Sequence, residues 1–99
     1  MNMKTCNTLD EARIEIDKVD EKIVELVALR NSYIKQIAKF KNTVEEVKSD
    51  ERIADVVSRA RTKAIELDLS PNLINDMFVR MIDEMVETEI AELTNTKVF

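Results

Sequence analysis

The feature that most constrains this chain is a helical apolar repeat that continues without a break from about Leu9 to Lys41. Branched apolar residues recur along it at steps of three, four and seven, the spacing of one face of an α-helix. They are Ile16, Ile23, Val27, Ile34 and Ile37. At ~1.5 Å per residue this helix is about 50 Å long, whereas a compact domain of this size has a radius of gyration of only ~13 Å. Two shorter helices cannot cover such a rod, so its apolar face requires a second chain, most simply a two-fold copy.

The alternative to one long helix is a break near Arg30-Asn31-Ser32, which would let the chain fold back on itself. The apolar period continues through these residues, and this continuity favours an unbroken helix.

The composition also favours helices over strands. The chain contains no glycine and a single proline, Pro71, whereas strand-rich folds need many tight turns built on those residues. Capping residues mark helix starts at Thr8, Ser49 and Ser70. Glu11 stands at the capping-box distance from Thr8, where its side chain would bond back to the Thr8 amide. The expected fold is all-α, with three helices per chain, one of them very long, in an intertwined homodimeric helical bundle.

We divide the chain into three parts. Residues 1–7 are expected to form a flexible N-terminal tail, residues 8–93 one helical domain, and residues 94–99 a C-terminal tail. Within the domain, the first helix should reach about Lys41, and Val44 to Lys48 should be a plain connection. A chain of 99 residues supplies only a modest core, so packing against a second copy would help.

Charge and residue types exclude several functions. The formal net charge is −5, and nucleic-acid binding needs a concentrated basic face. With no histidine and a single cysteine, Cys6, imidazole catalysis, the usual zinc sites and an internal disulfide are excluded. No apolar stretch approaches the ~20 residues of a membrane span, and Met1 to Thr8 lacks the apolar run of a signal peptide. We expect a cytoplasmic protein that binds neither nucleic acid nor membrane.

Four charged residues lie where the helical pattern calls for apolar ones. On a wheel at ~100° per residue, Arg13, Arg30 and Lys41 fall in or beside the apolar arc of the first helix. Glu89 continues the apolar line of the last helix. A buried charge needs a partner, unless the long basic side chains extend to the surface or pair with acidic neighbours. Three cations and one carboxyl on core faces of so short a chain indicate a polar pocket for a small anion.

The spacing of these residues suggests how such pockets are assembled. Arg30 and Lys41 share one helix face at a separation of ~16 Å, so their long side chains can converge on one small anion. Arg13 lies ~25 Å before Arg30 along the same rod and cannot reach that ligand within one chain. In an antiparallel two-fold pair it could arrive from the partner chain. We therefore expect two shared sites per dimer.

The same residues carry a family resemblance. The motifs, in chain order, are Arg13-Ile14-Glu15-Ile16-Asp17, Asp20, Leu29-Arg30, Lys39-Phe40-Lys41 and Glu51-Arg52. In order and spacing they resemble the all-helical chorismate mutases, a family with an isochorismate-pyruvate lyase branch, over residues 8–93. The resemblance implies an intertwined dimer of three-helix chains. It also implies the rearrangement of chorismate to prephenate in aromatic amino-acid biosynthesis, without metal or cofactor.

The resemblance further implies a role for each residue. Arg30, with Arg13 of the partner subunit, would clamp the two carboxylates of the substrate, because a guanidinium fork suits a carboxylate better than an ammonium does. Lys41 would donate to the ether oxygen as negative charge develops there. Glu51 would contact the ring hydroxyl, and Glu89 would complete the set at the ether oxygen.

Two departures from the family pattern bear on the reaction. Many members carry glutamine where this chain has Glu89, and an ionised carboxylate cannot donate, so Glu89 must be protonated to act. Burial would raise its pKa, and nearby Lys41 would lower it. The aspartate and arginine that many mutases place before Glu51 are also not evident in the short segment Val47-Lys48-Ser49-Asp50.

The second departure leaves other functions open. In this segment the chain is similar to the isochorismate-pyruvate lyases, which form salicylate and pyruvate. A mutase acting on an amino-substituted chorismate would use the same clamp. A third possibility, from another class, is a non-enzymatic helical dimerisation module whose basic residues only form interchain ion pairs.

Overall fold

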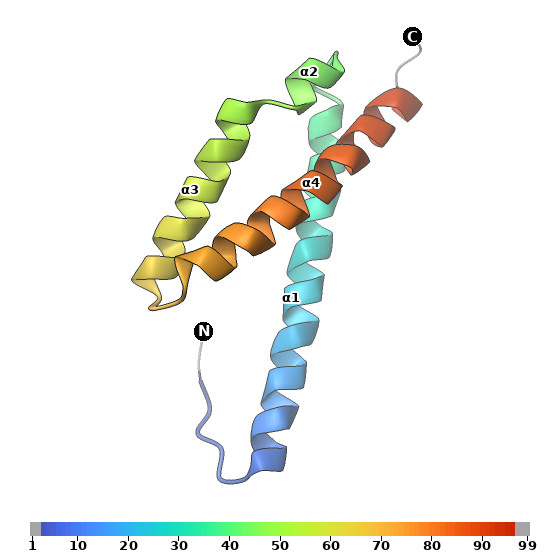
Figure 1. The fold of residues 1–99 in the computed structure, drawn as a ribbon. Coiled ribbons are helices and arrows are strands. Elements are labelled where there is room, and N and C mark those ends of the chain that lie inside the picture. The colour runs from blue at the N-terminus through green and yellow to red at the C-terminus, as the bar shows by residue number, and fades with distance from the viewer. Residues whose placement is uncertain (1–2, 97–99) are drawn as a thin grey trace. The chain divides into compact units, whose positions relative to one another are not determined.

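The computed structural model describes residues 3–96 and is all-helical over that range, as expected. Three long helices, α1 (Leu9–Ala38), α3 (Asp50–Glu66) and α4 (Pro71–Thr96), are joined by turns and by one short helix, α2 (Val44–Val47) (Figure 1). Within this part of the chain there is no strand. None of these helices is both long enough and apolar enough to cross a membrane.

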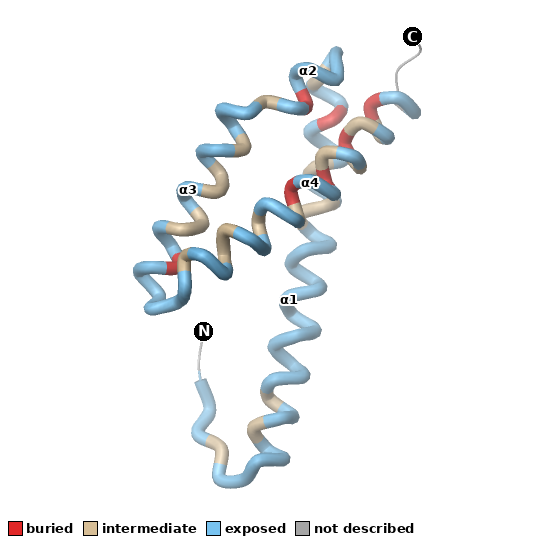
Figure 2. Tube along the Cα trace, in the orientation of Figure 1, coloured by how far each residue is buried: buried red, intermediate tan, exposed pale blue. Residues whose placement is uncertain are grey.

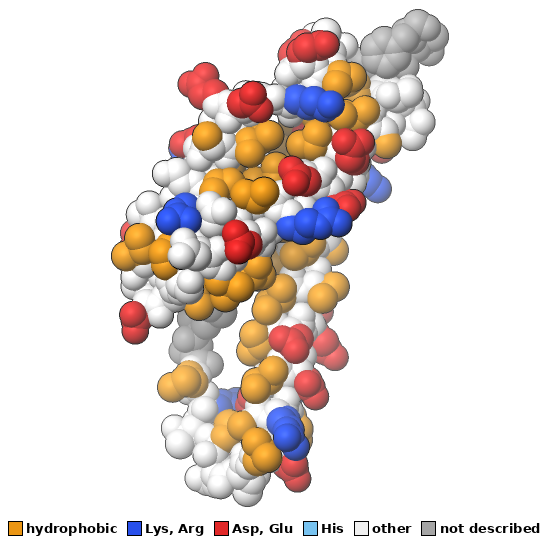
Figure 3. Space-filling model, in the orientation of Figure 1, with side chains coloured by type: hydrophobic (Ala, Val, Ile, Leu, Met, Phe, Trp, Pro, Cys, Tyr) orange, Lys and Arg blue, Asp and Glu red, His pale blue; other side chains and the backbone are white. Residues whose placement is uncertain are grey.

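By its internal contacts the chain forms two units, one up to Ser32 and one from Tyr33 onward. The first contains the N-terminal segment and most of α1, and none of its described residues is fully buried (Figure 2). Figure 3 shows hydrophobic side chains on the surface of this part of α1. The exposed large ones in the first unit include Leu9, Ile14, Ile16, Val19, Ile23, Val24, Leu26, Val27 and Leu29. Residues up to Ser32 therefore have no apolar core of their own.

Helix α1 is continuous, but its end differs from the prediction. It runs through Arg30, Asn31 and Ser32 without interruption, so a break at these residues is wrong. It ends at Ala38 rather than near Lys41, and the chain continues through a tighter turn with i→i−3 bonds, including Lys41 N to Ala38 O at 3.3 Å. Such 3₁₀ turns are common at helix ends. Here the tightening precedes Thr43, whose extended backbone begins the next helix.

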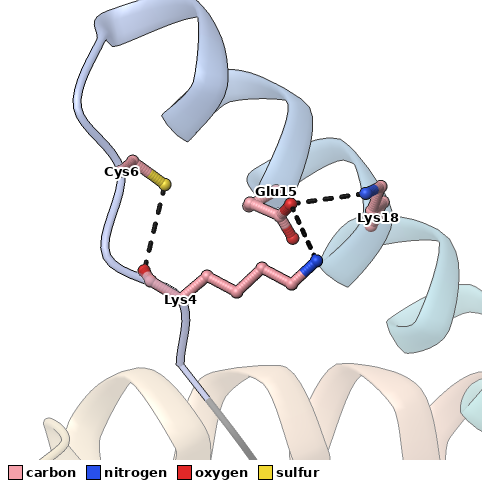
Figure 4. Close-up of polar contacts among 4 residues, drawn as sticks. All are labelled: Lys4, Cys6, Glu15 and Lys18. Atoms are coloured by element: carbon pink, nitrogen blue, oxygen red, sulfur yellow. Dashed lines mark hydrogen bonds and ion pairs between the residues drawn. The ribbon is translucent and has the colours of Figure 1, made fainter.

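The start of α1 is capped as predicted, with one change. The amide of Glu11 donates to Thr8 Oγ1 at 3.1 Å. The Glu11 carboxylate, however, accepts from the amide of Asn7 at 2.8 Å rather than from that of Thr8. In the close-up of Figure 4, the preceding segment lies beside α1, where the ammonium of Lys4 is 3.7 Å from Glu15. Glu15 also pairs with Lys18 at 3.3 Å, and Cys6 Sγ lies 3.9 Å from the Lys4 carbonyl (Figure 4).

The apolar core lies entirely in the second unit. Its buried hydrophobic residues are Ala38, Val47, Ala64, Ile82, Met85 and Leu93. Helices α3 and α4 form a hairpin and pack on each other, and α2 packs on α4. Helix α4 extends to Thr96, through residues that the sequence assigned to a tail, and residues 97–99 of that tail lie outside the described part.

The segment Val44–Val47, predicted as a plain connection, is one turn of helix. Its cap is Thr43, whose Oγ1 accepts from the amide of Glu46 at 3.2 Å. The caps predicted for the next two helices are confirmed. Ser49 Oγ accepts from the Arg52 amide at 3.3 Å, and Ser70 Oγ accepts from the Leu73 amide at 3.2 Å.

Helix α3 ends in a Schellman motif that requires a left-handed residue. The amide of Leu69 donates to the Ala64 carbonyl at 2.8 Å, and the amide of Asp68 donates to the Ile65 carbonyl at 3.1 Å. These are the two bonds of this motif, which usually has glycine at the position of Asp68. In this glycine-free chain Asp68 adopts φ 56° instead. Aspartate tolerates this conformation better than most residues do, although its Cβ is still crowded.

We expect the substitution Asp68→Gly to stabilise the fold by about 0.5–1 kcal/mol, because glycine adopts positive φ without steric conflict. Urea unfolding of parent and variant measures the difference in the free energy of unfolding. Asp68→Val is the matched control and should destabilise, since a β-branched side chain is poorly tolerated there. Equal free energies of unfolding for all three proteins would show that the positive φ of Asp68 has no steric cost.

Candidate functional site

Among residues 3–96, the only buried charged residue is Glu89, on α4. It is also one of the predicted site residues. Its side chain is 6% exposed, and its Oε2 has no hydrogen-bond partner among the described residues. Burial is the main cause that raises the pKa of Glu89 above its ordinary value. The expectation that this side chain is buried is confirmed, and that it acts as a protonated donor stays a prediction.

Lys41 is brought close to Glu89. It lies half-buried in the turn after α1, and its positive charge lowers the pKa of Glu89, against the larger effect of burial. The Lys41 ammonium donates to the Glu46 carbonyl at 2.9 Å. An ammonium has three N–H donors, so this bond occupies one of them. Lys41 and Glu89 thus form a pair of potential donors at one place in the second unit.

Sequence reasoning missed the contribution of α2 to this place. Thr43 and Glu46 have the spacing of a capping box, and that pattern could have predicted a helix start there. The interpretation of Val44 to Lys48 as a plain connection overlooked this pattern. It is the backbone of Glu46, not its carboxylate, that holds Lys41.

The two arginines lie on the part of α1 that belongs to the first unit. Arg13 is exposed and Arg30 is half-buried. They are separated by about 25 Å of continuous helix at ~1.5 Å per residue. One small ligand therefore cannot contact both arginines of the same chain, as the sequence predicted.

Glu51 lies exposed in the first turn of α3. Close to it, a shallow groove of about 550 Å³ runs between α3 and α4, lined by apolar residues such as Ile53, Val57 and Val79. Neither Lys41 nor Glu89 lines this groove. The chemistry therefore points to the Lys41–Glu89 pair rather than to the groove.

The polar groups of this site suit an anionic ligand that offers hydrogen-bond acceptors. A lysine supplies charge and donors, and a protonated carboxyl supplies one further donor. Among residues 3–96 there is no group of three or more His, Cys, Asp or Glu side chains that could hold a metal ion.

Comparison with known proteins identifies the family. Residues 12–90 match the family described as chorismate mutase type II. The chain belongs to this family. It is 30% identical over 92 residues to a chorismate mutase of Methanocaldococcus jannaschii, with 90% of this chain and 93% of the relative covered. It is 26% identical over 98 residues to an isochorismate pyruvate lyase of Pseudomonas aeruginosa, with 96% and 97% covered.

In this member of the chorismate mutase type II family, we expect Glu89→Gln to remove a pH-dependent part of the stability. The raised pKa means that the folded state retains the Glu89 proton to a higher pH than the unfolded chain does. The stability that depends on this proton is fully present below the unfolded-state pKa and is lost as the pH rises through the folded-state pKa.

Urea unfolding across a pH series tests this expectation. The variant should be more stable than the parent at neutral pH, because burial outweighs the attraction to Lys41, and this advantage should shrink in acid. The control Glu87→Gln changes an exposed carboxyl on the same helix and should show no such trend. A Glu89→Gln difference that does not vary with pH would refute the explanation.

Proposed function

We propose that this chain is a chorismate mutase that converts chorismate to prephenate as an intertwined homodimer, in aromatic amino-acid biosynthesis. Membership of the chorismate mutase type II family supports the reaction class, and the Methanocaldococcus relative supports the mutase. The cytoplasmic location expected from the sequence stays a prediction.

The observation that carries the proposal is the unbonded Oε2 of Glu89. A buried polar atom without a hydrogen-bond partner costs about 1–3 kcal/mol of stability. A bound ligand that pairs with Oε2 would explain why a carboxyl occupies this buried position. Here Lys41 is the neighbouring cation, and burial favours the protonated carboxyl. A lysine and a protonated glutamate together match what an ether oxygen of a bound substrate would accept.

In the proposed mechanism the protein forms no covalent intermediate. Chorismate rearranges in one concerted step, in which the C–O bond to the ring breaks as a new C–C bond forms. Arg30 and Arg13 of the partner subunit hold the two carboxylates, so that the reactive shape is bound in advance. Lys41 and protonated Glu89 donate to the ether oxygen where negative charge develops. Glu51 contacts the ring hydroxyl.

Support for the dimer comes from the first unit. Its described residues include no fully buried one, and the apolar side chains of α1 lie exposed in the single chain. Apolar surface of this extent is typical of a protein–protein interface. A partner chain would cover it, and would also bring Arg13 to a site that it cannot reach within one chain.

The second candidate function is isochorismate-pyruvate lyase activity. Two observations favour it. The match to the Pseudomonas relative covers nearly the whole chain, and the segment Val47-Lys48-Ser49-Asp50 before Glu51 departs from the pattern of many mutases. The same clamp would then hold isochorismate. The difference between the two reactions lies in contacts to the ring.

A side-by-side assay with chorismate, amino-substituted chorismate and isochorismate separates these functions. We expect prephenate from chorismate at the highest kcat/KM. Salicylate and pyruvate from isochorismate as the main products would make the protein a lyase. If no substrate is consumed, and a bicyclic dicarboxylate that mimics the transition state does not raise the melting temperature, the chain is a non-enzymatic module.

Complementation between two inactive variants tests the shared site. Arg13→Ala and Lys41→Ala should each lower kcat/KM by about two orders of magnitude, because each leaves a substrate charge or oxygen unpaired. After unfolding and refolding the two together, about one quarter of the parental activity should return, since each mixed dimer contains one intact site. If Arg13 acts within its own chain, or the protein is a monomer by sedimentation, no activity returns.

A further inference from the structure

The Lys41 ammonium is held by a backbone group rather than by a carboxylate. Its Nζ donates to the carbonyl oxygen of Glu46 at 2.9 Å. None of the ion pairs among residues 3–96 involves Lys41. A neutral carbonyl fixes the direction of the ammonium without cancelling its charge, whereas a carboxylate partner would do both. The position of Lys41 therefore depends on the position of the Glu46 peptide group.

That peptide group belongs to α2, a helix of four residues. Helices this short are unstable by themselves, because nucleation fixes several residues for few hydrogen bonds. Three contacts hold α2 in place. Thr43, at φ −134° and ψ 159°, accepts from the Glu46 amide at 3.2 Å, and the Lys48 amide donates to the Val44 carbonyl at 3.1 Å. The third contact is the packing of α2 on α4, and Val47, 6% exposed, is the buried residue of α2.

Helix α4 is also the helix that carries Glu89. One short helix therefore links the two elements of the site: it packs on α4, the helix that carries Glu89, and it binds the ammonium of Lys41. The Thr43 hydroxyl holds the amide of the same residue whose carbonyl holds Lys41. Loss of that hydroxyl loosens the first turn of α2, and with it the acceptor of Lys41.

We propose that Thr43 is a positioning residue, which holds the Lys41 ammonium beside Glu89 through the cap of α2 and the carbonyl of Glu46. Thr43 touches no substrate in this arrangement, and its effect passes through Lys41. The role of Thr43 in holding Lys41 rests on hydrogen bonds within the chain. Only the expected effect of Thr43 on turnover rests on the proposed mutase activity.

The test compares Thr43→Val, which keeps the shape of the side chain but removes the acceptor, with Thr43→Ser, which keeps the acceptor. Ser70→Ala is the matched control, because it removes another cap hydroxyl that accepts at 3.2 Å, at the start of α4. The main readout is the pKa of Glu89, followed by ¹³C NMR of the side-chain carboxyl and assigned by its absence from Glu89→Gln.

In Thr43→Val the pKa of Glu89 should rise, because Lys41 lowers it in the parent and is released in the variant. Thr43→Ser and Ser70→Ala should leave it unchanged. In a Lys41→Met background, Thr43→Val should have no further effect, which is the non-additivity expected of residues that act through one another. An unchanged pKa in Thr43→Val, or an equal rise with and without Lys41, would overturn the proposal.

Activity gives a second readout once a substrate is established. Thr43→Val should lower kcat/KM by up to about fivefold, the factor that corresponds to loss of one N-cap. Thr43→Ser should restore it to within about twofold of the parent, since serine caps as well as threonine does. If none of the proposed substrates reacts, the proposed function fails, but the NMR titration still decides the role of Thr43.

Discussion

The length of α1 is the constraint on which the rest of the structure depends. Thirty residues of continuous helix contribute a single buried residue, Ala38, and it lies at the very end. All of the apolar core is formed by residues after Tyr33, where α2, α3 and α4 pack. Nearly a third of the residues thus form a helix whose apolar side chains are mostly exposed in the single chain. Such a design makes sense when a second surface completes it, and in the proposed dimer that surface comes from another copy.

The site poses an electrostatic problem for an acidic protein. At a formal net charge of −5 the overall field repels an anion, so attraction must come from local cations. Lys41 keeps its charge available because its acceptor is a neutral carbonyl. Burial meanwhile raises the pKa of Glu89, which reduces the repulsion between this carboxyl and an anion. The effect on Glu89 depends on its burial on α4.

The sequence was a good guide to periodic structure and a weaker guide to its ends. The all-helical fold, the continuity of α1 and the caps at Thr8, Ser49 and Ser70 follow from spacing and side-chain chemistry alone. The end of α1 at Ala38 did not follow, because the apolar period continues while the hydrogen bonds tighten to i→i−3. Within the site, Glu89 was recognisable as a charge on an apolar line. The Lys41–Glu46 contact was not, because a backbone carbonyl has no signature in a sequence.

The absence of glycine has a consequence for the unfolded state. Glycine loses more conformational freedom on folding than any other residue, so a chain without it begins from a narrower ensemble and gives up less entropy when it becomes ordered. This helps a short chain whose core has few fully buried side chains. The same choice removes the residue best suited to a left-handed turn. Among residues 3–96, only Asp68 has a positive φ, so the steric cost of a chain without glycine falls on the single turn between α3 and α4.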